Sequence, residues 1–69
     1  MGVKNKLLEI RLQKGYKFQK DFAEYLGLNQ YQYNRYEKNE RQPALEVILN
    51  ICSSDKLNMD PRDIFYLEE

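Results

Sequence analysis

Apolar residues recur along this chain at intervals of three and four positions, the spacing of amphipathic helices rather than of strands. Residues 3–14 are the first such segment, and Gly15 follows as a helix stop. Its expected buried side consists of Leu7, Leu8 and Leu12. A second helix is predicted over residues 19–26, and Gly27 suits the positive φ that closes a helix. Its apolar side consists of Phe22, Ala23, Tyr25 and Leu26.

Three further helices are predicted from capping residues and apolar spacing. Asn29 is suited to cap a third helix that runs to about Lys38, and Asn39 to the left-handed position after it. After Pro43, a fourth helix is expected to carry a narrow apolar stripe of Leu45, Ile48, Leu49 and Cys52. Residues 60–63 combine an aspartate cap, a proline at the first helical position and an aspartate at the third, which predicts a last short helix. That helix carries Ile64, Phe65 and Leu67.

Five short helices joined by tight turns predict one compact all-α domain over residues 1–69. Only residues 27–29 separate the second helix from the third. Two helices joined by a turn of three or four residues that contains glycine are typical of a helix-turn-helix. The same turn also occurs as a plain connection in a helical bundle, so the geometry alone leaves both interpretations open.

The composition restricts the chemistry of this chain. Among its 69 residues there is no histidine, and so neither the usual general base near neutral pH nor the commonest metal ligand. Its single cysteine, Cys52, rules out an intrachain disulfide and a multi-cysteine zinc site, and fits a cytoplasmic location. The longest apolar runs, residues 47–49 and 64–67, are far shorter than the roughly 20 residues of a membrane span. We expect no enzyme activity, no cofactor, no bound metal and no membrane partner.

Three runs, residues 19–29, 33–39 and 43–46, resemble the phage repressor/Cro-like (Xre) family of helix-turn-helix proteins. The matching features are a glutamine that opens the second helix, an alanine four residues before glycine, an aromatic–glutamate pair that ends the third helix, and a proline before the fourth. The resemblance implies sequence-specific binding of double-stranded DNA by a stand-alone transcriptional regulator, a repressor from a phage or mobile element. Such proteins bind as dimers to pseudo-palindromic operators with half-sites about 10 bp apart.

Three positions depart from the family pattern. Phe18 stands where the family commonly has a serine or threonine cap, and Ala44 replaces the capping hydroxyl of the fourth helix. Asn39 replaces the usual glycine after the third helix, a conservative change because asparagine tolerates the left-handed region. The change at Ala44 predicts a weakly capped helix, at a cost of ~1 kcal/mol.

The third helix has two different sides when its residues are placed at intervals of about 100°. Tyr33 and Tyr36 point one way and are expected in the core. The opposite arc gathers amide and guanidinium groups, which can pair with adenine or guanine edges in the major groove, and one tyrosine. The expected base contacts are Gln30, Tyr31, Asn34 and Arg35. Each residue alone would also fit a solvated helix face, and it is their concentration on one arc that favours DNA.

The resemblance also implies contacts with the DNA backbone. In the family, the glutamine that opens the second helix contacts a phosphate and braces the first glutamine of the recognition helix, and Gln19 and Gln30 match these positions. The other candidates flank the start of the second helix or follow the third. The expected backbone contacts are Lys17, Gln19, Lys20, Lys38, Arg41 and Gln42. The alternative for the lysines is a role in solubility.

One charged residue lies inside the apolar arc of the first helix. Arg11 falls between Leu7 and Leu8 on the helical wheel, and a buried guanidinium is costly unless a carboxylate meets it. Glu37 matches the family's partner for this arginine. We therefore expect an ion pair between Arg11 and Glu37 that ties the first helix to the end of the third.

The apolar residues near the C-terminus are candidates for the contact of a homodimer. They are Ile64, Phe65 and Leu67, and the alternative is that they close the monomer's own core. A different function also remains open: an antitoxin-type protein-interaction module that represses its own operon.

The 11 basic and 11 acidic side chains give a net charge of zero, which is unusual for a small chain that binds DNA. The balance conceals two unlike halves, because residues 1–42 carry +4 and residues 43–69 carry −4. The expected DNA face lies in the basic half. Overall neutrality then predicts weak non-specific affinity and a greater dependence on base contacts and dimerisation.

Overall fold

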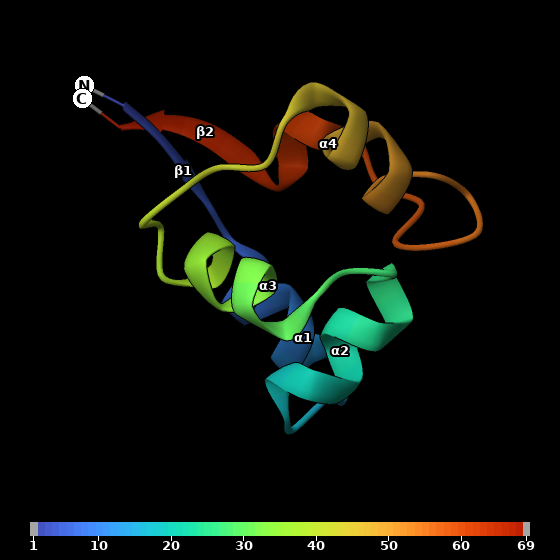
Figure 1. Cartoon of the computed structure of the whole chain (residues 1–69). Helices are drawn as coiled ribbons and strands as arrows, with labels where there is room; N and C mark the ends of the chain where they lie inside the picture. The colour runs from blue at the N-terminus through green and yellow to red at the C-terminus, as the bar shows by residue number, and fades with distance from the viewer. Residues whose placement is uncertain (1, 69) are drawn as a thin grey trace.

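The computed structural model describes residues 2–68, which form four α-helices and a two-stranded antiparallel sheet (Figure 1). In chain order the elements are β1 (Gly2–Asn5), α1 (Leu7–Gln13), α2 (Gln19–Leu26), α3 (Gln30–Glu37), α4 (Leu45–Ile51), the 3-10 turn η1 (Pro61–Asp63) and β2 (Phe65–Glu68). In Figure 1 the paired strands extend away from α1, α2 and α3. None of the helices within residues 2–68 has the length and apolarity needed to cross a membrane.

The expectation of five helices in an all-α domain is wrong at both ends of the chain. Residues 3–5, expected in the first helix, belong to β1, and the segment expected as the last helix forms η1 followed by β2. Val3 pairs with Leu67 and Asn5 with Phe65. Valine and aromatic side chains fit a pleated surface once a partner strand is present. The paired residues are 60 to 66 positions apart in the chain, so the spacing within either segment does not reveal the pairing.

The core draws side chains from all four helices and from the segment between η1 and β2. The side chains most completely shielded from solvent are Leu7, Phe22, Tyr33, Ile51 and Ile64. Tyr36 is also buried, which confirms the inward-facing side predicted for the third helix. Ile64 closes the monomer's core, which was the alternative to its role in a dimer.

The buried faces of α1 and α4 differ from the apolar stripes expected for them. On α1 the buried residues are Leu7, Ile10 and Arg11, and the exposed leucines are Leu8 and Leu12. On α4, Ile51 is fully buried, whereas Leu45 and Leu49 are exposed. Both helices carry apolar residues on more than one face, so packing against neighbouring elements, rather than periodicity, selects the face that is buried.

Three helices end in the same left-handed turn. Gly15, Gly27 and Asn39 follow α1, α2 and α3 with φ values of 86°, 76° and 60°. The backbone hydrogen bonds of a Schellman motif close each turn. Asn29 caps α3, because its side chain accepts a hydrogen bond from the backbone NH two residues further on. These features confirm the helix ends predicted at Gly27, Asn29 and Asn39.

Candidate nucleic-acid interface

Helix α3 separates a buried tyrosine side from an accessible polar side. Tyr33 is inaccessible to solvent and packs edge-on against Phe22 of α2, with ring centroids 5.5 Å apart. The residues predicted to contact bases lie on the accessible side. Tyr31 is 82% exposed, Gln30 and Arg35 are exposed, and Asn34 is half-buried.

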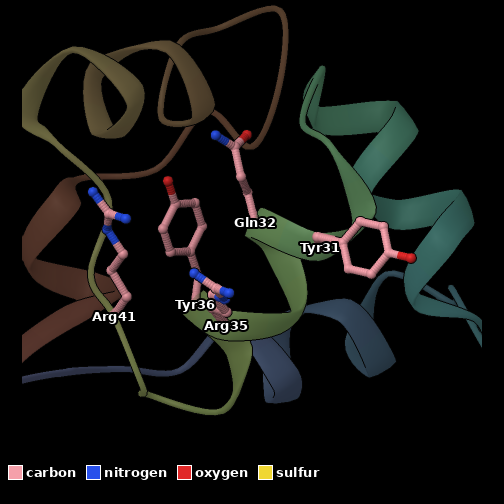
Figure 2. Close-up of a pocket in the computed structure, with 5 residues that line it drawn as sticks. All are labelled: Tyr31, Gln32, Arg35, Tyr36 and Arg41. Atoms are coloured by element: carbon pink, nitrogen blue, oxygen red, sulfur yellow. The ribbon is translucent and has the colours of Figure 1, made fainter.

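Two hollows divide this accessible side. The first, the amide hollow, is lined by Gln19, Gln30, Tyr31 and Asn34. The second, the arginine hollow, is lined by Tyr31, Gln32, Arg35, Tyr36 and Arg41 (Figure 2). Each measures about 210 Å³, less than the roughly 300–1,000 Å³ of a small-molecule site. The structure therefore groups Arg35 with Arg41 and separates it from Gln30 and Asn34, whereas Tyr31 lines both hollows.

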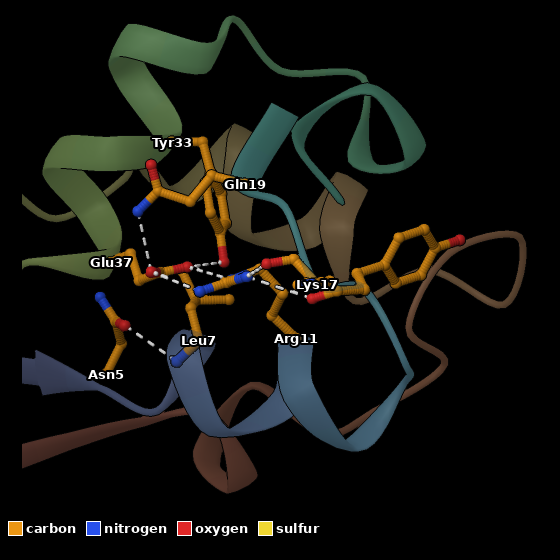
Figure 3. Close-up of polar contacts among 8 residues, drawn as sticks. Asn5, Leu7, Arg11, Lys17, Gln19, Tyr33 and Glu37 are labelled. Carbon is orange, nitrogen blue, oxygen red and sulfur yellow. Dashed lines mark hydrogen bonds and ion pairs between the residues drawn. The ribbon is translucent and has the colours of Figure 1, made fainter. Parts of the chain in front are cut away.

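Beneath the accessible side, Glu37 accepts hydrogen bonds from three other residues (Figure 3). Arg11 Nε and Nη2 lie 2.9 and 3.3 Å from its two carboxylate oxygens. Gln19 Nε2 lies 2.9 Å from Glu37 Oε1, and the Tyr33 hydroxyl donates to Oε2. The side chains of Arg11 and Glu37 are only 9% and 6% exposed. The structure thus joins α1 to the end of α3 by a buried ion pair.

This network keeps Glu37 ionised. Burial raises the pKa of Glu37, but the hydrogen bonds donated by Tyr33, Gln19 and Arg11 outweigh that effect and hold the pKa below its usual value. Burial and the neighbouring carboxylate raise the pKa of Tyr33, so the phenol stays protonated and donates. No group of three potential metal ligands occurs within residues 2–68. The arrangement around Glu37 is that of a structural joint between helices.

Arg11 also holds the loop that precedes α2. Its Nη1 donates to the backbone carbonyls of Tyr16 and Lys17, at 3.1 and 2.6 Å. Lys17 and Lys20 are both exposed beside the N-terminus of α2. They line a hollow of about 420 Å³ that also includes Gln30 of α3. Arg11 of the buried ion pair therefore holds the backbone of Lys17, one of the lysines predicted to contact phosphates.

A family model described as helix-turn-helix matches residues 7–61, from α1 to η1. The chain belongs to the helix-turn-helix family. The match is to the Xre type, whose members are DNA-binding transcription regulators and not typically enzymes. In this helix-turn-helix protein α2 and α3 are the two helices of the motif, and α3 is the recognition helix. Neither a curated protein nor a solved structure matches the chain.

In this helix-turn-helix protein the side chain of Gln42, predicted to contact the DNA backbone, forms hydrogen bonds within the domain. Gln42 Oε1 accepts from Asn5 Nδ2 at 2.8 Å, and Gln42 Nε2 donates to Asn39 Oδ1 at 3.0 Å. Each end of the amide makes a hydrogen bond within the fold, so Gln42 shapes the loop after α3. The other predicted residue of this loop, Arg41, is exposed, as is Lys38 at the end of α3.

Asn5 is a residue that sequence reasoning missed. It is 6% exposed, its backbone NH donates to Asn39 Oδ1 at 2.8 Å, and its Nδ2 donates to the carbonyl of Tyr36 at 2.7 Å. Its Oδ1 accepts from the NH of Leu7, the first residue of α1, from a position one residue before the cap residue Lys6. Asparagine side chains often accept a hydrogen bond from the backbone NH two residues further on, but a helix expected to start at residue 3 concealed that signal.

Proposed function

We propose that this helix-turn-helix protein is a transcriptional repressor that binds a pseudo-palindromic operator as a homodimer. The amide hollow carries the proposal. Gln30 and Asn34 each present an amide donor and acceptor from α3, which matches the N6 and N7 atoms of adenine. The exposed ring of Tyr31 suits a thymine methyl. The family assignment supports DNA binding, and these three side chains are the ones we propose to read the sequence.

Contacts with the two DNA backbones would flank these base contacts. At one end, Gln19 and Lys20 open α2 and Lys17 lies two residues before it. At the other end, Lys38 directly follows α3 and Arg41 lies in the loop after it. Such contacts set the position of the protein on the duplex and carry little sequence information. Gln19 has a second role, because its amide NH₂ already donates to Glu37.

Selection from random duplexes followed by gel-shift assays tests this function. We expect one palindromic sequence to be recovered. Asn34→Ala should relax the preference at one base pair of each half-site, whereas Lys20→Ala should weaken binding to all sequences alike. Failure of the wild-type protein to bind any duplex at about 50 mM salt, where phosphate contacts are strong, would refute the proposal.

The proposed dimer contact lies in the outer part of the sheet. Ile64 is fully buried and Phe65 packs against the same core, so these side chains serve the monomer. Leu67 is 67% exposed and pairs across the sheet with Val3, which is 45% exposed. We propose that Val3 and Leu67 pack against the same two residues of a second copy, in an isologous contact.

Sedimentation at micromolar concentration tests the dimer. Leu67→Glu should give a monomer with weakened operator binding, because a charge would replace an apolar contact. Leu12→Glu, at an exposed leucine of α1, is the matched control and should leave the dimer intact. A wild-type monomer both with and without operator DNA would refute the dimer, and higher expression from an operator-linked reporter would refute repression.

A further inference from the structure

We propose that the arginine hollow is a phosphate site, in which Arg35 and Arg41 together hold one phosphate of the DNA backbone. Arg35 is then a backbone contact rather than a reader of a base. This proposal rests on DNA binding through α3.

The position of the hollow on α3 is the first argument. With ideal helical spacing, the α3 residues of the arginine hollow are centred about 120° around the helix axis from those of the amide hollow. A helix with its side chains is about 10–12 Å across, and the major groove is about 12 Å wide. When one arc of α3 faces the base edges, an arc so far around the helix faces a wall of the groove. That wall is the sugar–phosphate backbone of one DNA strand.

The chemistry of the lining is the second argument. Within residues 2–68, neither Arg35 nor Arg41 has a carboxylate at ion-pair distance; the paired arginines are Arg11 and Arg62. Planar guanidinium groups match phosphate oxygens in paired hydrogen bonds. Figure 2 shows the Tyr36 hydroxyl between Arg41 and the amide of Gln32, while Tyr31 turns away. Two unpaired cations with two neutral hydrogen-bonding groups suit a single anion.

The rigidity of the loop is the third argument. The backbone NH of Arg41 lies 3.4 Å from the carbonyl oxygen of Arg35, to which it donates. On either side of Arg41, Asn39 and Gln42 are both hydrogen-bonded to Asn5, each at 2.8 Å. The backbone that carries Arg41 is therefore held before DNA arrives. Asn5 is a positioning residue for the phosphate site, although it lies in β1.

The first test measures Arg35→Ala on the selected operator and on its single base-pair variants. We expect affinity to fall by a similar factor on every sequence, and the slope of log K against log salt to become shallower by about one. Arg62→Ala, which removes an exposed arginine paired with Asp60, is the charge-matched control and should leave the slope unchanged. A loss of preference of about 5- to 150-fold confined to one base pair would mean that Arg35 reads a base, and would overturn the proposal.

The second test neutralises the operator phosphates one at a time with methylphosphonate. We expect one position in each half-site at which neutralisation weakens the wild-type protein, weakens Arg41→Ala less, and has no further effect on the variant that combines Arg35→Ala with Arg41→Ala. If no phosphate behaves in this way, the hollow does not hold the DNA backbone, and any anion it binds is a free one. Failure of the wild-type protein to bind any duplex would instead refute the proposed function, so the two failures are distinguishable.

The third test asks whether Asn5 acts through Arg41. Asn5→Ala should weaken operator binding in the wild-type background but not in the Arg41→Ala background, whereas a general loss of stability would weaken both. Gln42→Ala, which removes only one arm of the loop, gives the same test should Asn5→Ala fail to fold. Equal losses in both backgrounds would show that the loop contacts do not position Arg41.

Discussion

Replacing Glu37 with glutamine removes a carboxylate on which three side chains converge. The Arg11 side chain is 9% exposed, so its charge would be left buried without a counter-charge. Removing one partner of a buried ion pair costs about 3–5 kcal/mol. Arg11 keeps two carbonyl acceptors, those of Tyr16 and Lys17, which places the cost at about 3 kcal/mol, the lower end of this range. A domain of this size has a total stability of only about 3–10 kcal/mol, so the loss is a large fraction of it.

Thermal unfolding followed by circular dichroism at pH 7 measures this effect. A loss of about 3 kcal/mol corresponds to a fall in Tm of about 12–24 °C for a domain of 60–100 residues. Glu24→Gln, an equal change at an exposed position of α2, should change the stability by less than about 0.5 kcal/mol. Arg11→Met combined with Glu37→Gln should cost less than the two single changes added together, because no unpaired charge remains. A fall in Tm of less than about 4 °C for Glu37→Gln would refute this reasoning.

Three other predictions concern the buried carboxylate of Glu37, the cap of α4 and the left-handed residue after α3. The pKa of Glu37 is lowered in the folded state, so its contribution to the free energy of unfolding should be complete above the usual pKa of about 4.3 and be lost as the pH falls through the folded pKa. Stability measured against pH should therefore lack this loss in Glu37→Gln. Ala44→Ser should raise the free energy of unfolding by about 0.5–2 kcal/mol by capping α4, whereas Ala44→Val should not, as thermal melting will show. Asn39→Ala should destabilise more than Asn39→Gly, by about 1 kcal/mol, because both lose the amide but only alanine is strained at a φ of 60°; equal urea midpoints would contradict this.

Much of the helix-turn-helix could be predicted because its signals are local. The left-handed residues Gly27 and Asn39 and the cap at Asn29 act on backbone groups within a few positions of themselves. Arg11 was conspicuous for a similar reason, since a charge within an apolar arc requires a partner. The resemblance named Glu37 as that partner, and the structure places the two side chains 2.9 Å apart.

The remaining features depend on contacts between distant parts of the chain. Nothing in residues 2–5 alone separates a strand from a first helical turn, and the pairing with β2 decides the matter. The role of Gln42 is likewise decided by Asn5, which lies 37 positions earlier and meets both the loop and the end of α3. Side-chain type predicted an amide able to contact DNA, and only the fold shows that this amide is already engaged.

By itself the sequence determined where α2 and α3 begin and end, that α3 has a tyrosine side and a polar side, and that the charge is divided between two halves. These properties follow from helical periodicity and from hydrogen bonds that span at most one turn. Only the tertiary structure decided which leucines are buried, that the chain ends form a sheet, and that Arg35 shares a hollow with Arg41 rather than with Asn34. The reason is physical: which residues are buried, and which lie together, depends on how the helices and strands pack against one another. A helix with apolar residues on several faces can pack in more than one orientation, so its sequence pattern does not select one.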